Sequence, residues 1–447
     1  MLDAPQAGMV FRNSFFAPVV YFATALAAVA VVAAAGAADA SPELKALQQR
    51  NTTLEALVHQ QQSVIENLNR RVDAIEKSEG KRDAAGESET PPARSASGFN
   101  LGKVNLSGEG GVAFFHTGSE GAFPNSEFRV DEAKLFVEAP VWDDVYFFCE
   151  LKLATRENDD LGLRLGQLYL DFENVSKRWG RDRMLNVRLG RFDIPFGEEY
   201  LTRDAILNPL ISRSLSDLWG VDEGVELYGS VGKFSYVVAV QNGGESGTRD
   251  FNPDKAVVGR VAYDPTPWLH LSVSGMRTGD LDAINDYVSA LWIGNGWFRS
   301  IGGMNTTLFH ANLVEGDVAV RWNSGHLKAF GGAICYGDND PDANNGRSAY
   351  YYSVEAVQHL TGKLYGAARF SQILAEKGLP LIGHGNFDDY FYGPLATELH
   401  SLSLGLGYRF SEHLLLKVEY TLEGGKEVGG GQRNREDFFA AEAAFKF

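Results

Sequence analysis

Residues 401–422 read SLSLGLGYRFSEHLLLKVEYTL and contain two runs in which apolar and polar residues alternate. Every second residue from Leu402 to Phe410 is apolar or aromatic, and so is every second residue from Leu414 to Tyr420. A period of two places the two sets on opposite faces of a strand. A short polar connection joins the runs, so the segment predicts a pair of antiparallel strands.

The same alternation recurs throughout 99–447, with no convincing helical period. Sixteen segments show it: 102–117, 127–141, 145–155, 162–173, 183–194, 222–230, 233–241, 255–263, 268–277, 311–322, 326–336, 348–360, 363–374, 398–410, 412–422 and 434–447. Their number is even, and tight turns alternate with long loops between them. The connection at 174–182 is the exception, because the pattern requires a short one there.

Composition excludes several classes of protein. With 44% hydrophobic residues, the chain has too much core-forming material for disorder. Two cysteines are too few for a disulfide scaffold or a thiolate zinc cluster. A formal charge of −17 argues against a nucleic-acid partner.

The amino terminus reads as a secretory signal peptide over 1–40. Arg12 precedes an uncharged apolar run from Asn13 to Ala38, which is followed by the small-x-small site Ala38-Asp39-Ala40. The alternative is an uncleaved anchor helix, since the run is long enough to span a bilayer.

A heptad repeat over 41–79 predicts an α-helical coiled coil, with a helix start at Ser41-Pro42-Glu43. The seam positions are Leu44, Leu47, Asn51, Leu54, Val58, Gln61, Ile65, Leu68, Val72 and Ile75. A stripe this narrow requires a partner helix, although a helix lying on its own chain is the alternative. Residues 80–98 are small, polar and proline-containing, which is typical of a linker.

Two architectures hold sixteen antiparallel strands, namely a soluble sandwich or propeller and a transmembrane barrel. Alternation alone does not separate them, because only the barrel turns its apolar face outward. The signal, the even strand count, the alternating connection lengths and a final strand ending on Phe447 favour the barrel. We therefore predict an all-β chain with a sixteen-stranded antiparallel transmembrane β-barrel domain over 99–447, in the bacterial outer membrane.

Residues 189–197 read LGRFDIPFG, and the chain continues through Glu198-Glu199-Tyr200-Leu201-Thr202-Arg203 to Ser212-Arg213-Ser214-Leu215. This stretch resembles the phosphate-selective porin O and P family, in which a strand ends in Gly-x-Phe-x-x-Pro-Phe and leads into a loop with Glu-x-Leu and Arg-Ser-Leu. The resemblance implies a homotrimer whose loop, here 196–221, forms the constriction. It also implies an arginine ladder and a lysine cluster for phosphate.

Basic residues on the loop and on the expected lumen faces are the candidate pore residues. They are Arg191, Arg203, Arg213, Arg188, Arg260, Arg321, Arg369, Arg409 and Lys417, with Lys134 and Lys152 on the same expected faces. Guanidinium groups match oxyanions and remain charged, so a row of them suits phosphate. Alternatively, Arg203 and Arg213 pair with Asp204 or Asp217 and only fix the shape of the loop.

The acidic balance favours a general or mildly cation-preferring pore over an anion filter. The sequence thus predicts an outer-membrane porin for passive diffusion of small hydrophilic solutes or ions, with phosphate or another anion as a further reading. Its expected partners are outer-membrane lipid, the solutes and further copies of the chain, expected to form a trimer. The alternative is a structural protein whose coiled coil tethers envelope layers. No hydrolase motif, metal-ligand spacing or cofactor motif is present, so we expect neither an enzyme nor a cofactor.

Overall fold

The computed structural model describes residues 103–155, 162–218, 220–243, 250, 252–283, 297–298, 306–341 and 344–447. These residues belong to the second of the two units into which the chain divides, Ser97–Phe447. The predicted signal peptide (1–40), coiled coil (41–79) and linker (80–98) lie outside the described residues, as do residues 99–102 of the predicted barrel domain.

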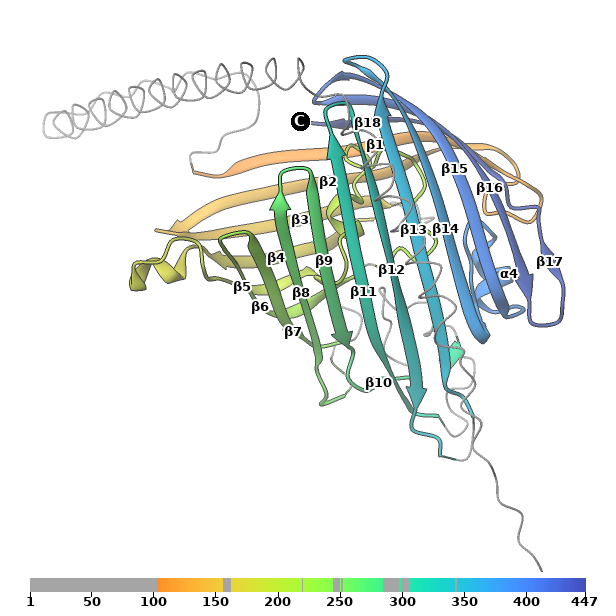
Figure 1. Ribbon diagram of the computed structural model, residues 1–447, viewed down its shortest axis with the longest axis horizontal. Coiled ribbons are helices and arrows are strands. Elements are labelled where there is room, and N and C mark those ends of the chain that lie inside the picture. Colours follow the sequence, from red (N-terminus) through yellow and green to blue (C-terminus); the bar gives the residue numbers. More distant parts are fainter. Residues whose placement is uncertain are drawn as a thin grey trace, which may run out of the picture. The chain divides into compact units, whose positions relative to one another are not determined.

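Sixteen long strands make up the described part of the chain (Figure 1). They are β1 (Asn105–Thr117), β2 (Glu127–Trp142), β3 (Val145–Thr155), β4 (Arg164–Phe172), β5 (Asn186–Asp193), β6 (Val221–Val231), β7 (Phe234–Gln241), β8 (Ala256–Thr266), β9 (Leu269–Arg277), β11 (Leu308–Trp322), β12 (Gly325–Asp338), β13 (Arg347–His359), β14 (Leu364–Leu379), β15 (Ala396–Ser411), β16 (Leu414–Glu427) and β18 (Phe438–Lys446). Two-residue strands β10 (Leu281–Asp282) and β17 (Gln432–Arg433) lie in loops. Short helices are η1 (Val175–Trp179), η2 (Glu199–Thr202) and α4 (Phe387–Phe391).

The sheet is antiparallel throughout and closes on itself. Each long strand pairs with the next one along the chain, and β18 returns to pair with β1 from Glu109–Lys446 to Thr117–Phe438. Closure gives every strand two neighbours, so no edge is left open to pair with another chain. The predicted all-β sixteen-stranded antiparallel barrel is confirmed. Among the described residues, no helix has the length and hydropathy needed to span a bilayer.

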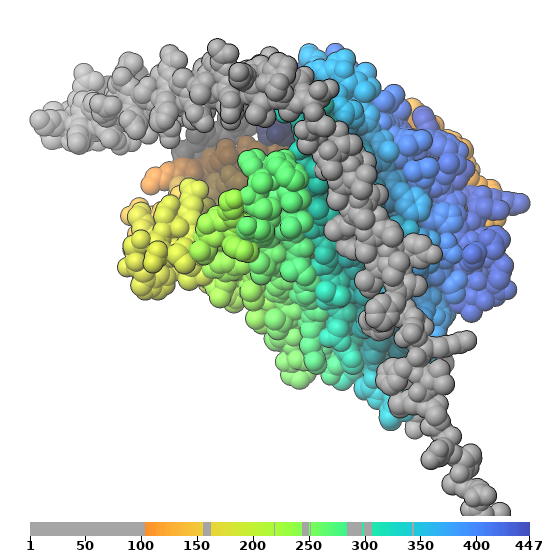
Figure 2. Space-filling model, in the orientation of Figure 1, coloured from red at the N-terminus to blue at the C-terminus, as the bar shows by residue number. Residues whose placement is uncertain are grey.

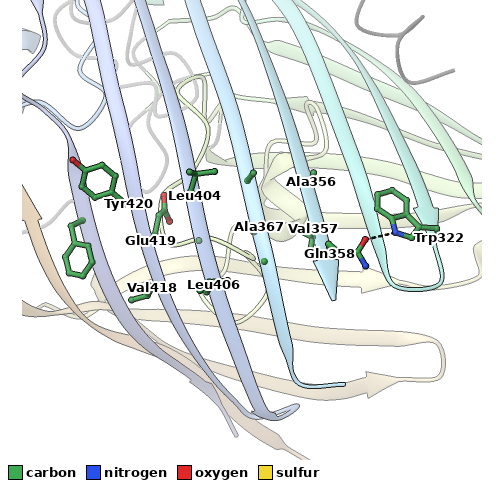
Figure 3. Close-up of a pocket in the computed structure, with 14 residues that line it drawn as sticks. Trp322, Ala356, Val357, Gln358, Ala367, Leu404, Leu406, Val418, Glu419 and Tyr420 are labelled. Atoms are coloured by element: carbon green, nitrogen blue, oxygen red, sulfur yellow. Dashed lines mark hydrogen bonds between the residues drawn. The ribbon is translucent and has the colours of Figure 1, made fainter. Parts of the chain in front are cut away.

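The two faces of the wall differ as a membrane barrel requires. On β16, the side chains of Val418 and Tyr420 are 41% and 47% exposed, whereas Lys417 and Glu419 between them are buried. Figure 3 shows the apolar outer surface over β13 to β16, where Leu404, Val418 and Tyr420 border a groove of about 700 Å³. Where it is visible in the space-filling view, the wall is continuous from strand to strand (Figure 2).

The unexpectedly long connection between β4 and β5 is an ordered structure. It holds η1, and the side chain of Asn174 accepts a hydrogen bond from the Arg183 amide at 2.7 Å. The Ser176 hydroxyl accepts bonds from the amides of Met184 (3.0 Å) and Leu185 (3.1 Å). These side chains satisfy backbone donors that a two-residue turn would not expose, which explains how a longer connection is stable here.

Candidate functional site

The connection between β5 and β6 lies inside the barrel. Its apolar residues Ile206, Leu210 and Ile211 are each 1–2% exposed, although they belong to a loop. Its polar contacts reach inward-facing side chains on β2, β8, β9, β14, β15 and β16, which are far from it in sequence. The wall therefore holds this loop from several sides of the lumen. We call the wall side chains that bond to the loop the loop anchors, and those on the six strands are Glu132, Arg260, Ser274, Arg369, Arg409 and Lys417.

Where the loop leaves β5, strands β8 and β9 hold it. The amide of Gly197 donates to the Ser274 hydroxyl at 3.1 Å, and the carbonyl of the same residue accepts a hydrogen bond from Arg260. His270 lies 2.8 Å from the Glu198 carboxylate. Gly197 has a φ of +64°, and a Cβ there would lie 2.1 Å from a Glu315 carboxylate oxygen. Only glycine fits this turn and this close approach.

The middle of the loop rests on a single buried ammonium group. Lys417 Nζ donates to the carbonyl oxygens of Ala205 (2.7 Å), Leu210 (2.9 Å) and Asn208 (3.3 Å). It also lies 2.7 Å from the carboxylate of Glu442 on β18. Three loop carbonyls and one carboxylate thus surround a side chain that is 4% exposed.

Two arginines and a tyrosine of the wall also donate hydrogen bonds to loop carbonyls. Arg369 donates to the Ser212 carbonyl at 2.8 Å and is held by Glu355 at 3.0 Å. Arg409 donates to the Ile206 carbonyl at 3.2 Å. The Tyr365 hydroxyl donates to the carbonyl of Pro209 at 3.0 Å. Each of these donors satisfies a loop carbonyl that has no strand partner.

Wall carboxylates bind the loop amides in the same way. Glu419 accepts hydrogen bonds from the amides of Ile211 and Ser212, the second at 2.8 Å, and Glu132 accepts one from the Ala205 amide at 2.6 Å. Amide donors to a carboxylate are stronger than neutral pairs. The loop backbone is therefore satisfied through both its carbonyls and its amides.

Three carboxylates gather around Lys134 at the β2 side. Oxygen atoms of Glu109, Glu132 and Asp204 lie within 4.8 Å of one another, a spacing that would suit a metal ion. The Lys134 ammonium contacts all three, at 3.2 Å from Glu109 and 3.1 Å from Glu132. Burial raises the pKa of the Asp204 carboxyl, but Lys134 outweighs it and holds that pKa below its usual value. The lysine thus places one positive charge among the three carboxylates.

Arg203 and Arg213 both lie beside Asp217 within the loop. Arg203 makes two hydrogen bonds to that carboxylate, at 2.8 and 2.7 Å, and an Arg213 nitrogen lies 3.9 Å from it. A two-pronged guanidinium–carboxylate pair is geometrically specific. Of the two predicted carboxylate partners, the structure places Asp217 next to these arginines.

The other candidate residues on strands β3 and β5 pair with carboxylates of the wall. Arg188 pairs with Asp171 and Glu226 on neighbouring strands, each at 2.9 Å. Arg191 pairs with Glu223 at 3.2 Å and is aligned with Leu168, an exposed residue of the apolar outer row. Lys152 pairs with Glu150, at 3.3 Å.

Arg321 is exposed near the turn between β11 and β12, opposite His326. Of the candidate residues, Arg260, Arg369, Arg409, Lys417 and Lys134 bond to the loop from the wall, and Arg203 and Arg213 belong to the loop itself.

Several anchors could not be recognised from the sequence. Glu132 and Glu419 occupy inner-face positions of the alternating pattern, which does not mark them as partners of the loop. Tyr365 and Ser274 stood out in no motif. The alternation of apolar and polar residues indicates which side chains face the lumen. It does not specify which of these side chains bonds to which atom of the loop.

No family model matches this chain, and no curated protein matches it. Solved structures do. The outer membrane channel DcaP of Acinetobacter baumannii has a TM-score of 0.52 at 13% sequence identity, covering 77% of this chain and 97% of that one. OmpT, an outer membrane protein of Vibrio cholerae, has a TM-score of 0.52 at 10% identity, covering 79% and 100%.

The fold is that of these outer-membrane β-barrels. Together with the closed barrel and its exposed apolar outer rows, this likeness confirms the predicted location in the bacterial outer membrane. At such low identity, the likeness extends to the fold alone. The resemblance of 189–215 to the O and P family stays a prediction.

Proposed function

We propose that this protein is a porin that lets small hydrophilic solutes or ions diffuse passively across the outer membrane, with the β5–β6 loop (196–221) as its constriction. The observation that carries the proposal is the set of loop anchors, which draw the loop backbone to six wall strands. A loop held in this way narrows the lumen of a barrel. Such a device sets the size and charge of what passes.

The anchors also bear on selectivity. The resemblance to the O and P family predicts phosphate as the solute, with basic wall residues as ligands. Yet Arg260, Arg369, Arg409 and Lys417 donate to loop carbonyls, and Arg203 binds Asp217. Donors used inside the protein do not replace the water shell of a passing anion. These contacts favour a general or mildly cation-preferring pore over a phosphate filter.

The reversal potential of the purified full chain in a planar bilayer tests this selectivity. Under a KCl gradient we expect a weak or cation-directed potential and no block when phosphate is titrated in. Anion selectivity with phosphate block would contradict the proposed preference and support the phosphate prediction instead.

Assembly is a separate part of the proposal. We propose a homo-oligomer, expected to be a trimer, to which the predicted coiled coil contributes. Comparing the mass of the detergent-solubilised full chain with that of a chain lacking 41–79 tests this contribution. The tether alternative predicts a different result, namely a weaker cell envelope and unchanged conductance when 41–79 is removed.

A further inference from the structure

A polar cavity of about 420 Å³ lies between the barrel wall and the beginning of the β5–β6 loop. Strands β4 to β8 supply the wall through residues such as Tyr169, Arg188 and Glu226, and η2 supplies Tyr200 from the loop. The volume lies within the range of about 300–1,000 Å³ that is typical of small-molecule sites. The loop anchors on β2 and on β14 to β16 are not part of its lining.

At this cavity Arg188 is paired with carboxylates, whereas Arg260 donates to the carbonyl of Gly197. Arg188 lies between two carboxylates, with Nη2 2.9 Å from Asp171 and Nη1 2.9 Å from Glu226. A guanidinium group has five N–H donors, and these contacts together with the Nε bond to Asp171 leave two of them available. The wall therefore offers hydrogen-bonding capacity without an unpaired charge on Arg188.

Tyrosine rings surround the same arginine. The Arg188 guanidinium lies 4.3 Å from the centroid of Tyr169 and 5.1 Å from that of Tyr228. Across the cavity, Arg260 lies 5.4 Å from the centroid of Tyr200. Within the described part of the chain, the Tyr169 hydroxyl makes no hydrogen bond, which leaves its donor and acceptor for a solute.

We propose, on the basis of the channel function above, that this cavity is a binding subsite for neutral polyhydroxylated solutes such as oligosaccharides. Because Phe148 stacks on the ring of Tyr169 and Arg188 lies over the same ring, the sugar is held mainly through its hydroxyl groups. These bond to the remaining N–H donors of Arg188, to the Tyr169 hydroxyl and to carboxylate lone pairs. A permanently charged solute gains less at Arg188 and Glu226, because binding either group requires breaking an internal ion pair.

The test uses maltotriose as the probe, with the full chain in a planar bilayer. Maltotriose is expected to reduce the ion current saturably, whereas a polyethylene glycol of matched size is expected to act without saturation. Tyr169→Leu is expected to raise the half-blocking concentration about three- to tenfold, as the loss of one hydrogen bond predicts. Tyr169→Phe removes the hydroxyl alone and is expected to give a rise of similar size. Tyr408→Leu, on the outer face of β15, is the matched control and is expected to leave the value unchanged.

Equilibrium binding of maltotriose to the detergent-solubilised full chain separates this proposal from the channel function. Saturable binding that Tyr169→Leu weakens supports the subsite, even if the chain fails to conduct. The subsite is overturned if the wild type shows no saturable binding, if the Tyr169 variants bind as tightly as the wild type, or if Tyr408→Leu has the same effect. A conducting channel without such binding would leave the proposed porin function intact.

Discussion

At the scale of single residues, the charged side chains of the lumen act chiefly on the backbone of their own protein. Lys417 contacts three loop carbonyls, and Glu419 accepts hydrogen bonds from two loop amides. Removing one partner of such a buried group leaves the other partners unsatisfied, which costs more than the pair itself contributes.

Replacing Lys417 with methionine tests this role, because the substitution keeps the unbranched stem and removes the ammonium. Three loop carbonyls and Glu442 then lose their partner, so we expect a loss of about 3–5 kcal/mol in the free energy of unfolding. We also expect a larger single-channel conductance, since the loop is released. Urea unfolding in detergent and bilayer recording measure the two effects.

Lys426→Met is the matched control on the same strand. Lys426 is largely exposed and pairs with Glu398 at 3.3 Å, so its loss should cost about 0–1 kcal/mol. Equal effects of the two substitutions would contradict the anchoring role of Lys417.

Much of this residue-scale picture lay beyond the sequence. The period of two correctly placed Arg260, Arg369, Arg409 and Lys417 on the inner face. Their partners, however, are backbone carbonyls of the loop. Every residue has such a carbonyl, so the sequence does not indicate which one accepts the hydrogen bond. The predicted anion-binding role therefore rested on side-chain chemistry and on the family resemblance.

At the scale of elements, most strands lie where the alternating pattern predicts them. Where a strand differs in length from the prediction, the cause is local. The prediction ended one strand at residue 374, whereas β14 continues to Leu379. Lys377 and Gly378 have φ values of +61° and +82°, which is a turn-like conformation. The pairing of β14 with β15 shifts its register between Leu374 and Leu379, on either side of these two residues. From sequence alone, residues 375–378 resemble a turn. The strand continues beyond them because Leu379 pairs with Ala396 of β15.

In the β5–β6 loop, the charge of Asp217 offsets that of the two arginines beside it. Asp217→Asn removes the carboxylate that faces Arg203 and Arg213 while keeping the size of the side chain. The positive charge of the two arginines is then less compensated, so we expect the reversal potential under a KCl gradient to shift toward chloride.

Asp250→Asn is the control, because Asp250 pairs with Lys255 in a different loop, at 2.6 Å. It should leave the potential unchanged. An unchanged potential in Asp217→Asn as well would mean that ions do not pass near this pair.

At the scale of the whole molecule, closure of the sheet decides what the alternating pattern means. Alternation fits a soluble sandwich as well as a barrel. The pairing of β18 with β1 and the exposed apolar rows place the polar face around a lumen. The even strand count and the alternating connections were enough to predict this closure. The inward path of the β5–β6 loop was expected from the family resemblance, because the length of the loop allows it to fold inward without requiring it.

The most direct test is the single-channel conductance of the full chain in a planar bilayer, compared with that of a chain lacking 203–215. The deletion removes most of the atoms that the loop anchors hold, and the strands on either side keep their pairing. Heat-modifiable migration on a gel verifies that the shortened chain still forms a barrel. We predict a stable conductance for the full chain and a larger one for the shortened chain. A full chain that does not conduct, or a folded deletion with unchanged conductance, would contradict the proposal that this barrel is a channel narrowed by its β5–β6 loop.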